Sequence, residues 1–143
     1  MAALDPVADP ADPADPLAER MPPARLYFGF AGRITRREFW LYGVLALLAL
    51  AVFGHALLAI AGVAPRHAEA LINLLLLWPA LAVSVKRWHD RDKSGWWVLI
   101  NLIPLVGTLW ALVDNGFLRG TAGPNRFGPD PLARPGDAVS SGR

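Results

Sequence analysis

Three uncharged runs divide this chain, covering residues 39–65, 70–85 and 94–113. A helix needs about 20 mostly apolar residues to cross the ~30 Å hydrocarbon layer of a membrane. The first and third runs reach this length, and the second rises only ~24 Å as a helix. We therefore expect Lys86 and Arg87, which end the second run, to snorkel toward the headgroups unless the bilayer thins locally. The pattern predicts an all-α membrane protein, a small bundle of three transmembrane helices.

The third run allows a second arrangement, because Pro104 and Gly107 interrupt it. The segment between them fits the turn of a re-entrant hairpin, which would return the chain to the side it came from. Against this, a turn at mid-membrane leaves backbone groups unpaired unless other protein covers them. We therefore prefer three spans and keep the hairpin as the alternative.

Lysine and arginine counts predict the side of the N-terminus. With three spans, nine of these residues lie on the side of the N-terminus and five on the other; with a hairpin, the split is thirteen to one. The positive-inside rule makes the richer side cytoplasmic in both arrangements. We therefore expect a multi-pass protein with a cytoplasmic N-terminus.

The two ends of the chain differ from the membrane domain, residues 25–131. Residues 1–24 contain Ala-Asp-Pro three times in succession and five acids against one base, which predicts a disordered acidic tail. An acidic, proline-rich start also differs from the positive start of a signal peptide. Residues 132–143 follow a segment rich in glycine and proline, and we expect a second disordered tail there.

Composition agrees with the membrane class and excludes several kinds of site. Of 143 residues, 54% are hydrophobic and only 18% charged, against about 25% in soluble domains. The absence of cysteine excludes a disulfide scaffold, a thiol nucleophile, a zinc ribbon and an iron–sulfur site. Positive charge beside apolar runs suits anionic lipid headgroups better than a nucleic-acid groove. We expect membrane phospholipids as partners, a homo-oligomer or a membrane-protein partner as further ones, and no nucleic acid or cofactor.

Arginine and aromatic residues gather at the edges of the runs, where rings sit at headgroup level and guanidinium groups bind phosphate. The plainer interpretation of Arg33, Arg36 and Arg37 is that they only set the orientation of the first helix. Glu38 either pairs with one of them or caps the helix start. The candidate interfacial and lipid-phosphate residues are Arg33, Arg36, Arg37, Arg87, His89, Asp90, Trp96, Trp97, Asn125 and Arg126.

A histidine and two carboxylates, His89, Asp90 and Asp92, also fit a divalent metal site or a general base. Four cations within residues 86–93 argue against a metal, because they repel it and pair with the carboxylates. We therefore expect a phosphate-binding or salt-bridge cluster, and no catalytic or metal residue. If the C-terminal segment lies on the same side, as in the hairpin arrangement, Arg126 can pair with Asp90 or Asp92.

Four ordered motifs over residues 26–131 closely resemble the DUF805 family of small bacterial inner-membrane proteins of unknown function. Their residues are Phe30, Gly32, Arg33, Arg36, Glu38, Phe39 and Trp40; Lys86 to Asp90 with Ser94 to Trp97; Ile103, Pro104 and Gly107; and Gly120, Thr121, Gly123, Asn125 to Gly128, Asp130 and Pro131. One departure is Trp88, where family members usually have leucine, and we expect an interfacial ring there. The resemblance implies a location in the bacterial inner membrane and no reaction.

These observations leave three hypotheses about function. The leading one is a non-enzymatic multi-pass protein that binds lipid headgroups or partner proteins through its Arg/Trp motifs. The second is a lipid-phosphate-modifying enzyme that uses His89 and Asp90. The third is an oligomeric channel or transporter component, because two or three helices of a monomer cannot enclose a pore.

Overall fold

The computed structural model describes residues 21–62 and 65–133, so the predicted tails at 1–24 and 132–143 lie largely outside the described residues. The described part is helical and contains no strand beyond an isolated bridge between Asn125 and Gly128. This confirms the all-α prediction. The elements are α1 (Pro23–Phe28), α2 (Arg36–Glu38), the π-helix η1 (Phe39–Leu45), α3 (Ala46–Ile60), α4 (Pro65–Asp90), the 3₁₀ helix η2 (Gly95–Leu102) and α5 (Val106–Gly116).

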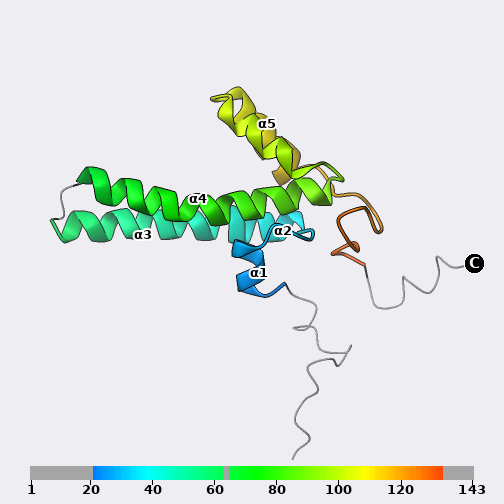
Figure 1. Cartoon of the computed structure of the whole chain (residues 1–143), viewed down its shortest axis with the longest axis horizontal. Coiled ribbons are helices and arrows are strands. Elements are labelled where there is room, and N and C mark those ends of the chain that lie inside the picture. The colour runs from blue at the N-terminus through cyan, green and yellow to red at the C-terminus, as the bar shows by residue number, and fades with distance from the viewer. Residues whose placement is uncertain (1–20, 63–64, 134–143) are drawn as a thin grey trace, which may run out of the picture.

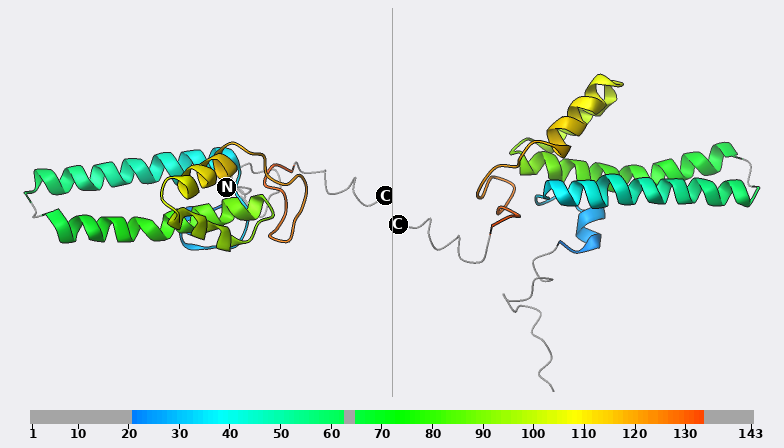
Figure 2. Two further views of the ribbon diagram at one scale, coloured as in Figure 1. Left: turned by 90° about the horizontal axis from the view of Figure 1, so that it is seen from above. Right: turned by 180° about the vertical axis from the view of Figure 1, so that it is seen from behind.

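Two long helices dominate the molecule (Figure 1). α2, η1 and α3 form one continuous helix, Arg36–Ile60, of 25 residues, and α4 supplies a second of 24 residues, His67–Asp90. Within the described chain these two are long and apolar enough to cross a membrane. They lie side by side in all three views (Figures 1 and 2).

The first long helix exposes apolar side chains along its length. No residue from Trp40 to Ile60 is buried by the described parts of the protein, and Leu48, Phe53 and Ile60 are among the most exposed. In water such a surface would be unfavourable by about 25 cal/mol for each Å² of apolar area. The exposed apolar surface of this helix is therefore suited to contact with lipid.

A capping box fixes the start of this helix at Thr35. The Thr35 side chain accepts a hydrogen bond from the Glu38 backbone N–H, and the Glu38 carboxylate accepts one from the Thr35 N–H at 2.8 Å. This arrangement satisfies two of the free donors at a helix start. Of the two roles expected for Glu38, the structure has the cap.

The third uncharged run forms a helical hairpin instead of a continuous span. η2 and α5 pack against each other and leave the long pair at an angle (Figure 1). The turn between them covers Ile103–Leu105, and Gly107 lies so close to η2 that a Cβ there would be 1.8 Å from the Ile100 carbonyl oxygen. Of the two arrangements weighed for this run, the structure has the hairpin. Pro104 and this turn interrupt the continuous third helix that the three-span arrangement requires.

The tightly packed part of the protein lies at one end of the long pair. Leu26, Ile34, Phe39 and Val83 form its apolar core, with Met21, Tyr27, Trp40 and Val44 packed against it. The residues after α5, drawn in orange, fold over the same end (Figure 1). We call this region, made by α1, the start of α2, the end of α4 and residues 117–131, the polar end.

Candidate functional site

Lys86 and Arg87 lie inside the polar end, contrary to the expectation that they snorkel. Both side chains are completely buried. The Lys86 ammonium donates to the carbonyl oxygens of Leu26, at 2.8 Å, and Gly29. These carbonyls belong to α1 and the residue that ends it, so the protein itself replaces the headgroup or water. The second long helix can therefore continue past its uncharged run to Asp90.

Arg87 joins the end of α4 to the end of the hairpin. Its guanidinium donates at 2.5 Å to the carbonyl oxygens of Asn115 and Leu118, and it forms an ion pair with Asp90. Arg87 was expected to contact lipid phosphate. Each of its three guanidinium nitrogens is instead bonded to a backbone carbonyl or a carboxylate within the chain.

Arg33 makes the second half of the same network. Its guanidinium lies 3.0 Å from Asp90 Oδ1 and donates to the carbonyl oxygens of Thr121, at 2.5 Å, and Gly123, at 2.7 Å. The Arg33 side chain is 1% exposed, so it too is withdrawn from lipid. Asp90 thus lies between two buried guanidinium groups, one from the loop before α2 and one from its own helix.

His89 and Asn125 hold the C-terminal loop on the end of α4. The His89 ring stacks on Phe127 with centroids 3.9 Å apart and planes 4° apart, and Nδ1 faces the Gly32 carbonyl oxygen at 3.3 Å. The Asn125 amide donates to the His89 carbonyl oxygen at 2.9 Å. Both candidate residues therefore serve contacts within the chain.

The pair predicted for Arg126 is present on the surface. Arg126 Nε lies 3.2 Å from Asp92 Oδ1, and its Nη2 donates to the Asp92 carbonyl oxygen at 2.7 Å. The contact requires residues 117–131 and the end of α4 to lie on one side, as in the hairpin arrangement. This prediction is confirmed for Asp92, whereas Asp90 pairs with Arg33 and Arg87.

A third ionic contact, centred on Asp114 of α5, was missed by the sequence interpretation. Its carboxylate, 5% exposed, lies 3.1 Å from Arg91 and 2.9 Å from Lys93. Lys93 also lies 5.1 Å from the ring centroids of Trp88 and Trp97. Trp88 is completely buried, so the interfacial ring expected there is wrong. The position of Asp114 in the sequence could have indicated this contact, because Asp114 directly follows the third run and Arg91 and Lys93 lie just before it.

The remaining candidates are exposed. Arg36 and Arg37 lie on the surface at the start of the first long helix, and Trp96 and Trp97, on η2, are 77% and 45% exposed. Arg36 gives one hydrogen bond to the Phe117 carbonyl oxygen at 2.8 Å. The ten candidates therefore divide into an internal group and an exposed group.

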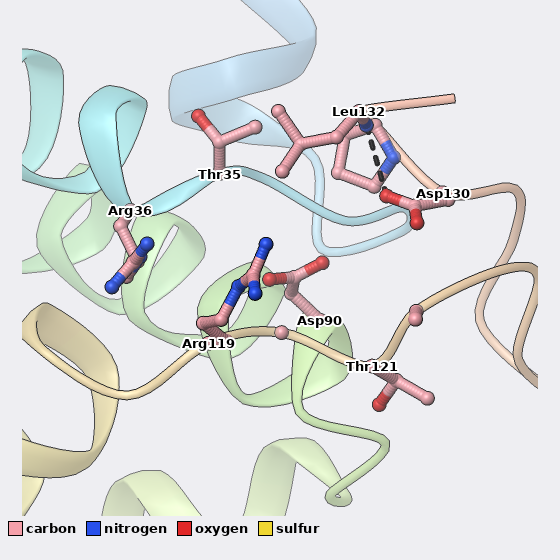
Figure 3. A pocket seen from close by; sticks show the side chains of 10 residues that line it. Thr35, Arg36, Asp90, Arg119, Thr121, Asp130 and Leu132 are labelled. Carbon is pink, nitrogen blue, oxygen red and sulfur yellow. Dashed lines mark hydrogen bonds between the residues drawn. The ribbon is translucent and has the colours of Figure 1, made fainter. Parts of the chain in front are cut away.

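A cavity of about 320 Å³, which we call the polar cavity, opens beside the Arg33–Asp90–Arg87 network (Figure 3). Thr35, Arg36, Arg119 and Thr121 line it, and Asp90 and Asp130 contribute carboxylates. Although desolvation opposes the change, backbone N–H donors from Leu132 and Gly123, each at 2.9 Å, lower the pKa of Asp130. Arg119 was not among the sequence candidates, because no local pattern distinguishes it from the other arginines of the loop.

Within the described residues, Arg119 and Arg37 make no hydrogen bond or ion pair through their guanidinium groups. No group of three metal-ligating side chains occurs in residues 21–62 and 65–133. The exposed arginines can therefore donate to an external anion, whereas the buried ones are committed to the fold.

These features define a small helical membrane protein whose two long helices meet a compact, arginine-rich end. The model of the family described as "Protein of unknown function (DUF805)" matches residues 27–129, and the chain belongs to that family. The chain is 38% identical over 113 residues to the Inner membrane protein YhaH of Escherichia coli, covering 76% of this chain and 92% of the relative. It is 36% identical to the Inner membrane protein YhaI of the same organism, covering 73% and 87%.

A third relative, the Uncharacterized protein YiiR of Escherichia coli, is 35% identical over 72% of this chain and 86% of its own length. No solved structure matches the chain significantly. The names of the first two relatives support an inner-membrane location for this protein.

Proposed function

We propose that this protein is a non-enzymatic, multi-pass inner-membrane protein whose polar end faces the cytoplasm and binds the headgroups of anionic phospholipids. The observation that carries this proposal is the division of the arginines. Arg33 and Arg87 are buried and bonded within the protein. Four other arginines are exposed at the same end: Arg25, Arg36, Arg37 and Arg119. Cations at the membrane surface each attract anionic lipid by about 1 kcal/mol.

The position of the tryptophans supports the same orientation. Trp96 and Trp97 lie on the hairpin next to the polar end, and such rings prefer the headgroup level. Thirteen of the fourteen lysines and arginines belong to the segments on this side of the two spans, with Arg66 as the exception. By the positive-inside rule, this distribution supports a cytoplasmic polar end.

A fluorescence experiment tests the lipid preference. The protein is reconstituted into phosphatidylcholine vesicles that contain either brominated phosphatidylglycerol or brominated phosphatidylcholine at equal mole fraction, and quenching of its tryptophans is compared. We expect stronger quenching by the brominated anionic lipid, reduced in Arg37→Ala. Arg66→Ala, which removes one arginine from the start of α4, serves as the control. Equal quenching by both lipids in the unaltered protein contradicts the proposal.

The two other hypotheses receive less support from the contacts. A general base at Asp90 would have to leave two arginines, and His89 is stacked on Phe127. A channel needs polar groups that face a partner, but His55, within the first long helix, is bonded to the Ala51 carbonyl oxygen of its own helix at 2.7 Å.

A further inference from the structure

Two cavities adjoin at the polar end. The second, about 730 Å³, shares Thr35, Arg36 and Leu132 with the polar cavity. Its other walls come from α1, from the residues before it and from the first turns of the first long helix. We call this second cavity the apolar groove.

The polar cavity offers donors to a phosphate group. Arg36 keeps donors beyond its single bond to Phe117, and Arg119 has no described partner for its guanidinium. Both line the cavity, and Figure 3 shows the Arg119 guanidinium reaching toward Asp90. The cavity and its surroundings contain two carboxylates, those of Asp90 and Asp130, against the four guanidinium groups of Arg33, Arg36, Arg87 and Arg119, so positive charge is in excess. Paired guanidinium groups bind phosphate oxygens with charge-assisted hydrogen bonds.

The apolar groove offers surface to a hydrocarbon chain. Apolar and aromatic side chains supply seven of its eleven lining residues, and Arg37 and Glu38 lie among the polar ones; the seven are Met21, Pro23, Leu26, Tyr27, Leu41, Tyr42 and Leu132. Leu41 and Tyr42 belong to the membrane-crossing helix Arg36–Ile60 and are about 40% exposed. The groove therefore begins where the bilayer begins and continues into a cationic cavity, which matches the order of groups along a phospholipid.

We propose that the polar end holds one phospholipid molecule, with its phosphate between Arg36 and Arg119 and its acyl region along the apolar groove. This rests on the proposed lipid-binding function and adds a defined, single-molecule site to it. Leu132, shared by both cavities, would lie beside the glycerol region, where the polar and apolar parts of the lipid meet. The groove favours a lipid over free phosphate, because inorganic phosphate leaves its apolar wall unoccupied.

Native mass spectrometry of the detergent-purified protein tests the site directly. We expect a fraction of the unaltered protein to retain one phospholipid. Arg119→Ala should lower that fraction about tenfold, because one charge-assisted hydrogen-bond partner is lost. Arg25→Ala is the matched control, since Arg25 is exposed on α1 but lines neither cavity.

A second pair of variants tests the groove. Leu41→Ala should lower lipid retention, while Leu48→Ala, an exposed leucine of the same long helix outside the groove, should leave it unchanged. Dihexanoyl-phosphatidylglycerol added to the detergent should displace the retained lipid at concentrations at which inorganic phosphate does not. If inorganic phosphate displaces the lipid equally well, the site is a phosphate site and the lipid assignment is wrong.

The outcomes separate this site from the general function. If tryptophan quenching shows an anionic preference but no lipid is retained, or if Arg25→Ala and Arg119→Ala lower retention equally, the single-lipid site is overturned and the headgroup preference stands. If the quenching preference is absent as well, both proposals fail.

Discussion

Asp90 is the residue on which the polar end depends most. Its one carboxylate is the shared counter-ion of the guanidinium groups of Arg33 and Arg87, both of which are buried. Removing one partner of a buried ionic cluster leaves uncompensated charge and costs about 3–5 kcal/mol. We therefore expect Asp90→Asn to lower the free energy of unfolding by about this amount, measured by denaturant titration in mixed micelles.

Asp92→Asn is the matched control for that measurement. The Asp92 side chain is 47% exposed, and its pair with Arg126 is a surface pair. Such pairs contribute about 0–1 kcal/mol. An equal decrease in the free energy of unfolding in the two variants would show that the buried Arg33–Asp90–Arg87 network stabilises the protein no more than a surface ion pair.

Gly120 is restricted by the same carboxylate. A Cβ at this position would lie 1.9 Å from Asp90 Oδ2, which is closer than atoms can approach. Gly120→Ala should therefore push residues 117–131 away from α4, at a cost of about 1–3 kcal/mol. Limited proteolysis of this loop measures the effect. Thr121→Ala, at the exposed neighbouring position, should leave the cleavage rate unchanged, and equal resistance of both variants contradicts the expectation.

The hairpin contains a strained turn at its tip. Leu105 has φ of 60° and ψ of −65°, and the Val106 N–H donates to the Pro104 carbonyl oxygen at 2.7 Å, which defines a γ-turn of the rare form. Glycine relieves the strain of positive φ but adds freedom to the unfolded chain. We expect Leu105→Gly to stabilise the protein by about 1 kcal/mol in thermal unfolding.

Leu102→Gly provides the comparison, because Leu102 is 77% exposed and Leu105 is 78% exposed, but Leu102 lies at the end of η2. There glycine only adds unfolded-state freedom, and we expect a loss of about 0.5–1 kcal/mol. If Leu105→Gly destabilises the protein as Leu102→Gly does, the turn stores no strain.

The contrast between predicted and observed elements follows the range of the interactions that determine them. The two long helices could be predicted because apolar runs and the Thr35–Glu38 cap are local properties of the sequence. The partners of Arg33 and Arg87 other than Asp90 could not, because they are backbone carbonyls of residues 115–128, and any residue type can supply a carbonyl. The choice between a third span and a hairpin depends on the same distant contacts.

At the scale of the whole molecule, the contacts between distant segments determine its topology. Arg33, before the first long helix, is bonded to the carbonyl oxygens of Thr121 and Gly123, after the hairpin. If both long helices cross the bilayer, the two ends of the membrane domain must therefore lie on one side. Because the chain has no cysteine, single cysteines report this directly.

We expect cysteines at Ala24 and Ser140 to be protected from an impermeant maleimide in intact spheroplasts, and a cysteine at His67, near the start of α4, to react. All three should react after lysis, which controls for local burial. Reaction at Ser140 with protection at Ala24 would restore the three-span arrangement. Reaction at both with protection at His67 would show that the two ends share a side and that this side is not the cytoplasm. That result would contradict the positive-inside argument and the proposed cytoplasmic position of the polar end.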